Sequence, residues 1–371
     1  MIVSRVNPMV ALEVSSLLVS RPSGIGVFGR ALVRELRALL GDDQVELVFP
    51  CTRYFERRYH PSPGLRLRPY LDGRRLHRRY GLLHALDTRL PATFQGPLVA
   101  TVHDVLSALP LAAEHELSTE RFRERKCQKY RAIAARADAV VTVSEETRAR
   151  FCANFKVRGR IEVIYPGVDS EFAPRSVPDA RLHDLGLEAG KYILSVGELC
   201  RRKNLEAVVE SFLALRRQNA RRAPEKLVLV GRESFGWEGS RAHRLAREHG
   251  DCVRLLGFLA LEDLASVYAG AAAYLQLSHY EGFGLPILEA MAAGTPVVAA
   301  ARGGIPEAAG DASLLVDPDE PATVVGALAR LMSDPDLARR KRQEGLDRAA
   351  TFRWDRSAQQ VARLYETLLY R

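Results

Sequence analysis

The chain has 371 residues, which is long enough for two domains of ordinary size. Hydrophobic residues make up 47% and charged residues 27% of the sequence, proportions that exclude a disordered or fibrous protein. The formal net charge of +9 favours anionic partners such as nucleotides, phospholipid surfaces or nucleic acid, and an arginine-rich solvated surface explains it equally well.

Two further features bear on the compartment. No run of 18 apolar residues occurs, and polar residues break up the N-terminal stretch, so we expect neither a membrane-spanning helix nor a signal peptide. The cysteines are scattered without any C-x-x-C pair, which predicts reduced thiols rather than a disulfide or zinc framework. We therefore expect a cytoplasmic protein. The cysteines are Cys51, Cys127, Cys152, Cys200 and Cys252.

A glycine-rich turn opens the first helix. After a strand over 10–14 and a polar loop, Gly24-Ile25-Gly26-Val27-Phe28-Gly29 begins a helix that is predicted to continue to Leu40. The glycines fit the dinucleotide pattern G-x-G-x-x-G, but about nine residues separate them from the strand, whereas the true fingerprint follows its strand at once. No carboxylate ends the next strand, at 45–49. A nicotinamide-dependent oxidoreductase is therefore the weakest alternative.

A basic segment runs from Thr52 to Tyr80. It holds nine arginines against two acidic residues, Glu56 and Asp72, with aromatic residues interleaved. This composition fits an anionic membrane surface or a lipid-linked diphosphate, and equally a solvated basic surface. No DNA- or RNA-binding motif accompanies it, so we expect no nucleic-acid partner.

The first half continues as strands that alternate with helices. A strand over 98–102 ends in His103-Asp104, at the place where parallel α/β sheets bind their ligands. A lone histidine there is either structural or ligand-binding. Pro174 and Pro178 mark a linker, so we predict a first domain over residues 1–175.

The second half restarts the alternation that a parallel sheet requires. Between its first strand and the next helix lies a turn with three consecutive cations, Arg201, Arg202 and Lys203. A helix N-terminus already favours anions, so this turn predicts a diphosphate site, with a solvated basic turn as the alternative. We predict a second domain over 188–350 and a closing segment over 351–371. The predicted strands are 192–197, 226–231, 253–256, 273–277, 296–299 and 313–316.

The stretch from Ser278 to Ala299 carries two glutamates, Glu281 and Glu289. A turn of Gly282, Phe283 and Gly284 separates them, and a short helix is predicted over 287–293. The glycines let the backbone approach a ligand closely, and amides at a helix start hold phosphate or sugar oxygens. A capped helix with two solvated glutamates is the alternative.

Two D-x-D strings, Asp317-Pro318-Asp319 and Asp334-Pro335-Asp336, have the composition of metal-binding motifs. Each directly precedes a helical stretch, so we interpret both as helix caps. We therefore predict no metal site.

The string E-G-F-G-L-P-x-x-E-A-M-A-x-G-x-P-V-V fixes many positions at once and resembles the retaining glycosyltransferases of family 4. Four shorter strings agree with it: S-G-I-G at the first glycine turn, T-V-H-D, P-G-V-D and R-K-N. One position departs from the family. Many members place an arginine directly after the glycine that corresponds to Gly197, where this chain has Glu198, which leaves Lys203 as the best phosphate ligand.

The resemblance implies the α/β fold called GT-B, in which two doubly wound Rossmann-like domains face each other across a cleft and the last helix crosses back to the first domain. It implies that a sugar moves from a nucleotide sugar to an acceptor hydroxyl with retention of configuration and without a cofactor. His103 and Glu281 are the implied catalytic residues. The implied donor-binding residues are Gly24, Gly26, Arg202, Lys203, Phe258, Leu259, Phe283, Gly284, Leu285 and Glu289.

The roles that the resemblance implies are distinct. Lys203 and a neighbouring arginine hold the diphosphate, Glu281 binds sugar hydroxyls, and Glu289 holds the ribose. The loop with Phe258 and Leu259 reads the base, and His103 contacts the sugar from the first domain.

The donor and the acceptor are less determined. The H-D and R-K-N strings look most like bacterial mannosyltransferases that use GDP-mannose, while UDP-glucose, UDP-N-acetylglucosamine and a deoxysugar donor stay open. The expected acceptor is a glycan, a lipid-linked molecule or a small molecule, and peripheral contact with the anionic inner membrane face is one interpretation of the basic segment. The alternative function is a non-catalytic nucleotide-sugar-binding protein on the same fold.

Overall fold

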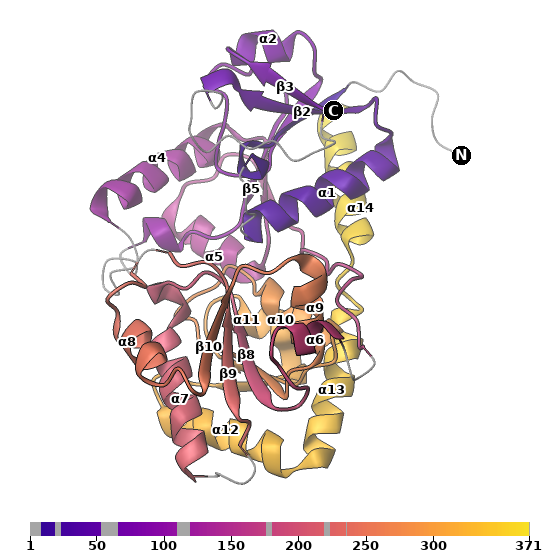
Figure 1. Cartoon of the computed structure of the whole chain (residues 1–371). Coiled ribbons are helices and arrows are strands. Elements are labelled where there is room, and N and C mark those ends of the chain that lie inside the picture. Colours follow the sequence, from indigo (N-terminus) through magenta and orange to yellow (C-terminus); the bar gives the residue numbers. More distant parts are fainter. Residues whose placement is uncertain are drawn as a thin grey trace. The chain divides into compact units, whose positions relative to one another are not determined.

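The chain forms two compact units in a computed structural model (Figure 1). Residues 9–18, 24–52, 66–109, 119–175, 180–218, 223–234 and 236–370 are described. One unit holds the described residues of Met1–Ala108, Arg121–Gly167 and Arg353–Arg371, and the other is built mainly from Val168–Phe352. The chain therefore leaves the first unit after Gly167 and returns to it at Arg353.

The first unit is a parallel sheet with helices. Its strands are β1 (Val10–Glu13), β2 (Val45–Pro50), β3 (Leu67–Tyr70), β4 (Leu82–Ala85), β5 (Leu98–Val102), β6 (Ala139–Thr142) and β7 (Arg160–Val163). Its helices are α1 (Gly24–Leu40), α2 (Gly73–His77), α4 (Glu120–Arg136), α5 (Glu145–Asn154) and α14 (Trp354–Leu369), with 3₁₀ turns η1 (Ser15–Leu17) and η3 (Leu106–Ala108).

The described strands of the first unit pair in the order β3-β2-β1-β4-β5-β6-β7. Strands β1, β4, β5 and β6 are buried along their whole length, as expected for apolar runs that are covered on both faces of a parallel sheet. The order reverses between β1 and β4, and a crevice at the carboxyl ends of the strands there is the usual ligand site of such sheets.

Helix α14 completes the first unit from the far end of the chain. It packs along α1, beside which it runs in Figure 1. Its Tyr365 hydroxyl lies 2.6 Å from Nδ1 of His84 on β4, and the other ring nitrogen of His84 lies 2.8 Å from the hydroxyl of Thr101 on β5. Burial lowers the pKa of His84 to about 3, so the ring stays neutral. This buried polar chain fixes α14 to the sheet.

The second unit has the same architecture. Its strands are β8 (Tyr192–Val196), β9 (Lys226–Val230), β10 (Val253–Gly257), β11 (Ala273–Gln276), β12 (Val297–Ala300) and β13 (Leu314–Val316). Its helices are α6 (Ala180–Asp184), α7 (Leu205–Gln218), α8 (Arg241–Glu248), α9 (Leu261–Ala269), α10 (Leu285–Ala292), α11 (Ile305–Ala309), α12 (Pro321–Ser333) and α13 (Pro335–Ala349), with 3₁₀ turns η4 (Arg201–Lys203) and η5 (Gly310–Ala312).

The described strands of the second unit pair in the order β10-β9-β8-β11-β12-β13, all in parallel. One face of the sheet is buried under α7, α8 and α12, in a core that includes Ile193, Leu275 and Phe212. Helix α10 packs against α9, α11 and α13, which form a second group of helices around it. The strand order reverses between β8 and β11, so the segments that follow these two strands meet at one edge of the sheet.

Most of the predicted elements are confirmed. Both halves are doubly wound parallel sheets, and the helix expected over 287–293 spans Leu285–Ala292, with Pro286 in its first turn, where a missing N–H is tolerated. Across the described residues, we find no helix with the length and apolar character needed to cross a bilayer.

One of the two predicted helix caps is wrong. Asp334 caps α13 by accepting hydrogen bonds from the amides of Asp336 and Leu337, as predicted. Asp317 does not cap α12, which starts at Pro321 after Glu320 with no side-chain cap. Instead, Asp317 accepts the amide of Asp319 at 3.0 Å, and both carboxylates form ion pairs with Arg302. The string closes a turn that is separated from the helix by Glu320 alone.

Candidate active site

Lys203 is placed by a compact turn that follows β8. The chain leaves the strand at Gly197, whose φ of +142° favours glycine, and then forms the 3₁₀ turn Arg201–Lys203. Asn204 adopts the left-handed conformation with a φ of +51°, which ends the 3₁₀ turn and lets α7 begin at Leu205. The lysine therefore stands at the N-terminal end of a 14-residue helix, where an anion is favoured.

Two glycines allow the close packing of the turn that carries Lys203. A Cβ on Gly197 would lie 2.7 Å from Nζ of Lys203, so any larger residue would displace the ammonium group. A Cβ on Gly231, at the end of β9, would lie 1.8 Å from the carbonyl oxygen of Gly197. Gly197 thus leaves room for the Lys203 side chain, and Gly231 lets the backbones at the ends of β8 and β9 approach closely.

Glu281 is held from behind by a second glycine turn. The amide of Gly304 donates to the carbonyl oxygen of Glu281 at 2.8 Å. A Cβ on Gly303, which has a φ of +57°, would lie 2.7 Å from that same oxygen. The Gly303-Gly304 turn thus fixes the backbone from which the Glu281 carboxylate projects.

These two turns bring three charged side chains together. Oε1 of Glu281 lies 2.8 Å from Nζ of Lys203, and Oε2 lies 2.6 Å from Nη1 of Arg202. The same Arg202 nitrogen donates to the carbonyl of Tyr280 at 3.1 Å. Lys203 and Glu281 are only 8% and 9% exposed. Burial alone would raise the pKa of Glu281, but the charges of Arg202 and Lys203 outweigh it and lower the pKa to about 2.

Glu289 lies on α10 in a different electrostatic environment. The hydroxyl of Tyr268 donates to its Oε2 at 2.8 Å. Burial raises the pKa of Glu289 to about 7, and the nearby charge of Asp169 acts in the same direction. The two glutamates of the motif therefore differ: Glu281 is ionised at any working pH, whereas Glu289 titrates near neutrality.

The other predicted donor-binding residues of this unit differ in whether their side chain or only their backbone is accessible to a ligand. Gly284 and Leu285 form the start of α10, whose first amides have no partner within the helix. Phe258, which follows β10, is 45% exposed, and its neighbour Leu259 is half-buried. The ring of Phe283 is only 4% exposed and packs against Phe352, so only its backbone can serve a ligand.

The predicted residues of the first unit cluster near its strand ends. Gly24 and Gly26 form the first turn of α1. Phe28 on the same helix contacts the ring of His103 edge-on, with the two ring centroids 4.8 Å apart. Nε2 of His103 lies 2.8 Å from the carbonyl oxygen of Leu86, which only accepts, so Nε2 carries the proton. Burial lowers the pKa of His103, so the ring is neutral and Nδ1 is an acceptor.

Several residues that shape the site belong to no sequence motif by which they could be recognised. Tyr268 sets the environment of Glu289 but lies on an ordinary amphipathic helix. Gly231 follows the buried strand β9 just as Gly197 follows the buried strand β8. This repeated pattern in the sequence could have identified Gly231 as part of the site. Glu198, the position where the chain departs from the family pattern, accepts a 2.9 Å hydrogen bond from Nε of Arg232, which directly follows Gly231.

Comparisons with known proteins agree with this geometry. The family model described as "Glycosyl transferases group 1" matches residues 183–348, and the one described as "Glycosyltransferase Family 4" matches residues 22–172. Together they cover most of both units, with the first matching the charged cluster around Glu281.

Individual proteins are similar over most of the chain. O-antigen chain mannosyltransferase B of Escherichia coli is 30% identical over 278 residues, which span 73% of this chain and 70% of that protein. D-inositol 3-phosphate glycosyltransferase of Corynebacterium jeikeium is 31% identical over 303 residues, 79% of this chain and 72% of that protein. The solved structure of sucrose-phosphate synthase from Thermosynechococcus elongatus is 25% identical and matches 98% of this chain and 99% of that one with a TM-score of 0.78. The chain therefore belongs to glycosyltransferase family 4, has the GT-B fold, and is an enzyme that transfers a sugar from a nucleotide sugar.

Proposed function

We propose that this enzyme transfers mannose from GDP-mannose, with retention of configuration, to a hydroxyl of a glycan, a lipid-linked molecule or a small molecule. The similarity to a mannosyltransferase supports the donor sugar. The observation that carries the proposed chemistry is the cluster of Arg202, Lys203 and Glu281 at the edge of the second sheet where β8 and β11 end.

The cluster is suited to a leaving diphosphate. It contains two cations and one anion, so it keeps a net positive charge after the ion pairs have formed. Lys203 also stands at the N-terminal end of α7, whose dipole favours negative charge. Pre-positioned cations of this kind stabilise the charge that develops on a leaving group without reorganising during the reaction.

Glu281 is better suited to positioning a sugar than to attacking it. Both of its oxygens face cations, and its pKa of about 2 makes it a weak base and a weak nucleophile. A carboxylate held in this way still accepts hydrogen bonds from sugar hydroxyls. We therefore favour attack by the acceptor hydroxyl on the face that the diphosphate leaves, with a phosphate oxygen taking the proton. The role of His103 toward the sugar stays a prediction.

A donor screen tests the proposal directly. GDP should raise the midpoint of thermal unfolding more than UDP does, NADH should leave it unchanged, and GDP-mannose should be hydrolysed slowly without an acceptor. Preference for UDP sugars would overturn the proposed donor. Tight binding of every nucleotide sugar without hydrolysis or transfer would instead favour a non-catalytic binding protein.

Chelation should leave turnover unchanged. Asp334 caps a helix and Asp317 closes a turn, so neither D-x-D string is arranged as a metal site for the donor. Initial rates should therefore agree within error before and after dialysis against EDTA, measured well below the unfolding temperature. Loss of the rate in EDTA and its return with manganese or magnesium would contradict this expectation.

The affinity for the nucleoside diphosphate should depend on pH through Glu289. Its pKa of about 7 means that the side chain is mostly protonated at pH 6 and mostly ionised at pH 8. An ionised carboxylate accepts stronger hydrogen bonds from ribose hydroxyls, so calorimetry should show severalfold tighter binding of GDP at pH 8 than at pH 6. The Glu289→Gln variant should bind more weakly at pH 8 and lose this dependence.

Glu13 supplies a matched control. It is fully buried in the first unit, where burial raises its pKa to about 7 as well. For both glutamates the folded state holds the proton more tightly, so each lowers stability as pH rises from about 4.5 to about 7, by up to roughly 3 kcal/mol. Glu13→Gln should reduce this loss of stability but leave the pH dependence of GDP binding intact. If it flattens that dependence too, Glu289 is not its source.

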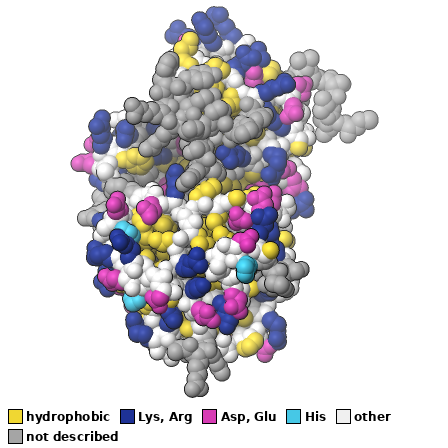
Figure 2. Space-filling view, in the orientation of Figure 1, with side chains coloured by type: hydrophobic (Ala, Val, Ile, Leu, Met, Phe, Trp, Pro, Cys, Tyr) yellow, Lys and Arg dark blue, Asp and Glu magenta, His cyan; other side chains and the backbone are white. Residues whose placement is uncertain are grey.

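We also propose that the basic segment brings the enzyme to an anionic membrane surface. Arg53, Arg57 and Arg58 lie outside the described residues, but six arginines of the segment are described and all are exposed: Arg66, Arg68, Arg74, Arg75, Arg78 and Arg79. Arg68 and Arg79 form ion pairs with Glu46, and Leu71 is 78% exposed beside them. Figure 2 shows basic side chains gathered over the region of α2.

Liposome sedimentation tests this surface. Each arginine near an anionic surface contributes about 1 kcal/mol, and salt screens the attraction. Binding should therefore require anionic lipid and weaken as salt rises. Reversing Arg74, Arg75 and Arg78 to glutamate should abolish it without changing GDP affinity, whereas reversing the exposed arginines of α13 (Arg339, Arg340 and Arg342) should not. Equal loss in both variants would indicate a response to net charge alone.

A further inference from the structure

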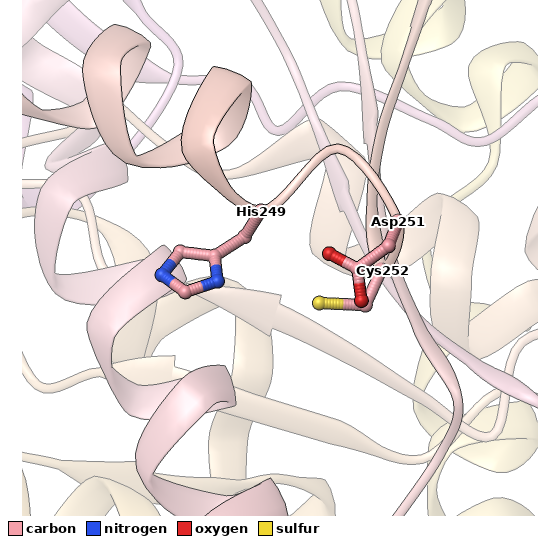
Figure 3. Close-up of side chains that lie close together, drawn as sticks. All are labelled: His249, Asp251 and Cys252. Atoms are coloured by element: carbon pink, nitrogen blue, oxygen red, sulfur yellow. The ribbon is translucent and has the colours of Figure 1, made fainter.

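A second group of chemically reactive side chains lies at the turn between α8 and β10. His249 follows the helix, and Asp251 and Cys252 come just before the strand. An imidazole nitrogen, a carboxylate oxygen and the sulfur lie within 4.8 Å of one another, and no other such group of three or more occurs among the residues that the structure describes. In Figure 3 the sulfur of Cys252 points toward the imidazole, with the carboxylate of Asp251 beside it.

The backbone of this turn is fixed. The amides of Cys252 and Val253 both donate to the carbonyl oxygen of His249, at 3.0 and 2.7 Å, and Leu227 on β9 donates to the carbonyl of Cys252 at 2.8 Å. Cys252 is 3% exposed and belongs to the core, whereas His249 is half-buried and Asp251 is exposed. One ligand-type atom is thus anchored, and the other two have room to adjust around it.

We propose, against the expectation of no metal site from the sequence, that His249, Asp251 and Cys252 bind a divalent transition-metal ion, with Zn²⁺ as the ion that suits them best. Imidazole nitrogen, thiolate sulfur and carboxylate oxygen are the ligand types that Zn²⁺ takes in proteins, and a solvent-facing turn leaves the fourth position to water. When the metal–sulfur bond forms, the Cys252 thiol releases its proton to solvent and the metal keeps its oxidation state. The thiolate and the carboxylate then balance the two positive charges.

The spacing of the ligand atoms limits the affinity. Neighbouring ligand atoms of a tetrahedral zinc site lie about 3.5 Å apart, so the side chains of His249 and Asp251 must close on the sulfur.

The site is separate from the donor site. The metal-binding turn precedes β10, whereas the segments with Lys203 and Glu281 follow β8 and β11. All strands of this sheet run in parallel, so the two sites lie at opposite ends of the strands: one at their amino ends and the other at their carboxyl ends. The bound ion should therefore hold the end of α8 against the start of β10 and stabilise the second unit against unfolding, without taking part in the transfer reaction.

Cobalt provides the probe. The full-length protein, freed of metal with a chelator, should bind one equivalent of Co²⁺ with a sulfur-to-cobalt charge-transfer band, and Zn²⁺ should displace the Co²⁺ and raise the midpoint of thermal unfolding. Cys252→Ser should remove the band, and His249→Gln should weaken Co²⁺ binding by at least about tenfold. Cys152→Ser, which changes an exposed cysteine of the first unit, should leave Co²⁺ binding unchanged.

The outcomes separate the proposal from its alternatives. A charge-transfer band that is absent from the wild type, or that persists in Cys252→Ser, would overturn the site. If Cys252→Ser does not fold, as circular dichroism would show, His249→Gln still decides the matter because it changes a side chain outside the core. An affinity of His249→Gln for Co²⁺ equal to that of the wild type would show that the metal binds elsewhere.

Discussion

The Glu281→Gln variant should lose sugar transfer by a factor of about 10² to 10³ while keeping its affinity for the nucleoside diphosphate. Glutamine preserves the shape of the side chain but removes the negative charge that Arg202 and Lys203 hold in place. Its weaker hydrogen bonds would no longer orient the sugar in the transition state. The two cations would face the diphosphate with one anion fewer nearby, so binding of GDP should not weaken.

Steady-state kinetics and calorimetry on the same preparation test this separation. The fall should appear in kcat, with the dissociation constant of GDP unchanged or lower. Glu225→Gln, which breaks an exposed ion pair with Lys191 in the same unit, is the control and should behave like the wild type. Near-normal turnover in Glu281→Gln would remove Glu281 from the reaction.

The Lys203→Met variant should bind GDP roughly 10- to 150-fold more weakly, which corresponds to the loss of a charge-assisted hydrogen bond worth about 1.5–3 kcal/mol. Methionine keeps an apolar stem in the space that Gly197 leaves, so the turn should stay folded. Guanosine, which lacks the phosphates, should lose little affinity.

The comparison between GDP and guanosine is the decisive measurement. An equal loss for both ligands would show that Lys203 supports the fold of the site and does not bind phosphate. The double variant Lys203→Met with Glu281→Gln controls for the buried carboxylate that the single change leaves with one cation fewer. If its GDP affinity returns to the wild-type value, the single variant reports on Glu281 and not on the phosphates.

The sequence predicted the fold well because parallel strands that are buried on both faces read as continuous apolar runs. The strands 192–196 and 226–230 and the glycines that end them were visible in this way. The first D-x-D string misled the prediction, because an aspartate before a helix can close a turn instead of capping. Only the structure shows from which amide such an aspartate accepts a hydrogen bond, and for Asp317 this is the amide of Asp319.

The candidate site was predicted as residues but not as an arrangement. The sequence assigned Lys203 to phosphate and Glu281 to sugar as separate tasks, yet the two side chains form an ion pair between segments that follow different strands. Periodicity and spacing carry no information on such a pairing, which depends on the order of β8 and β11 in the sheet. The difference between the two glutamates was hidden for the same reason, since Tyr268 and Asp169 come from other elements.

The return of α14 to the first unit has a consequence for synthesis on the ribosome. The first sheet is translated early, but the helix that covers α1 and contacts His84 belongs to residues 354–369 and is made after the whole second unit. Translation adds roughly 5–20 residues per second, so the first sheet remains for many seconds without the helix that covers this surface. During that time the surface of the first unit that α14 covers in the folded protein is exposed to solvent, so this unit cannot complete its fold until residues 354–369 have been made.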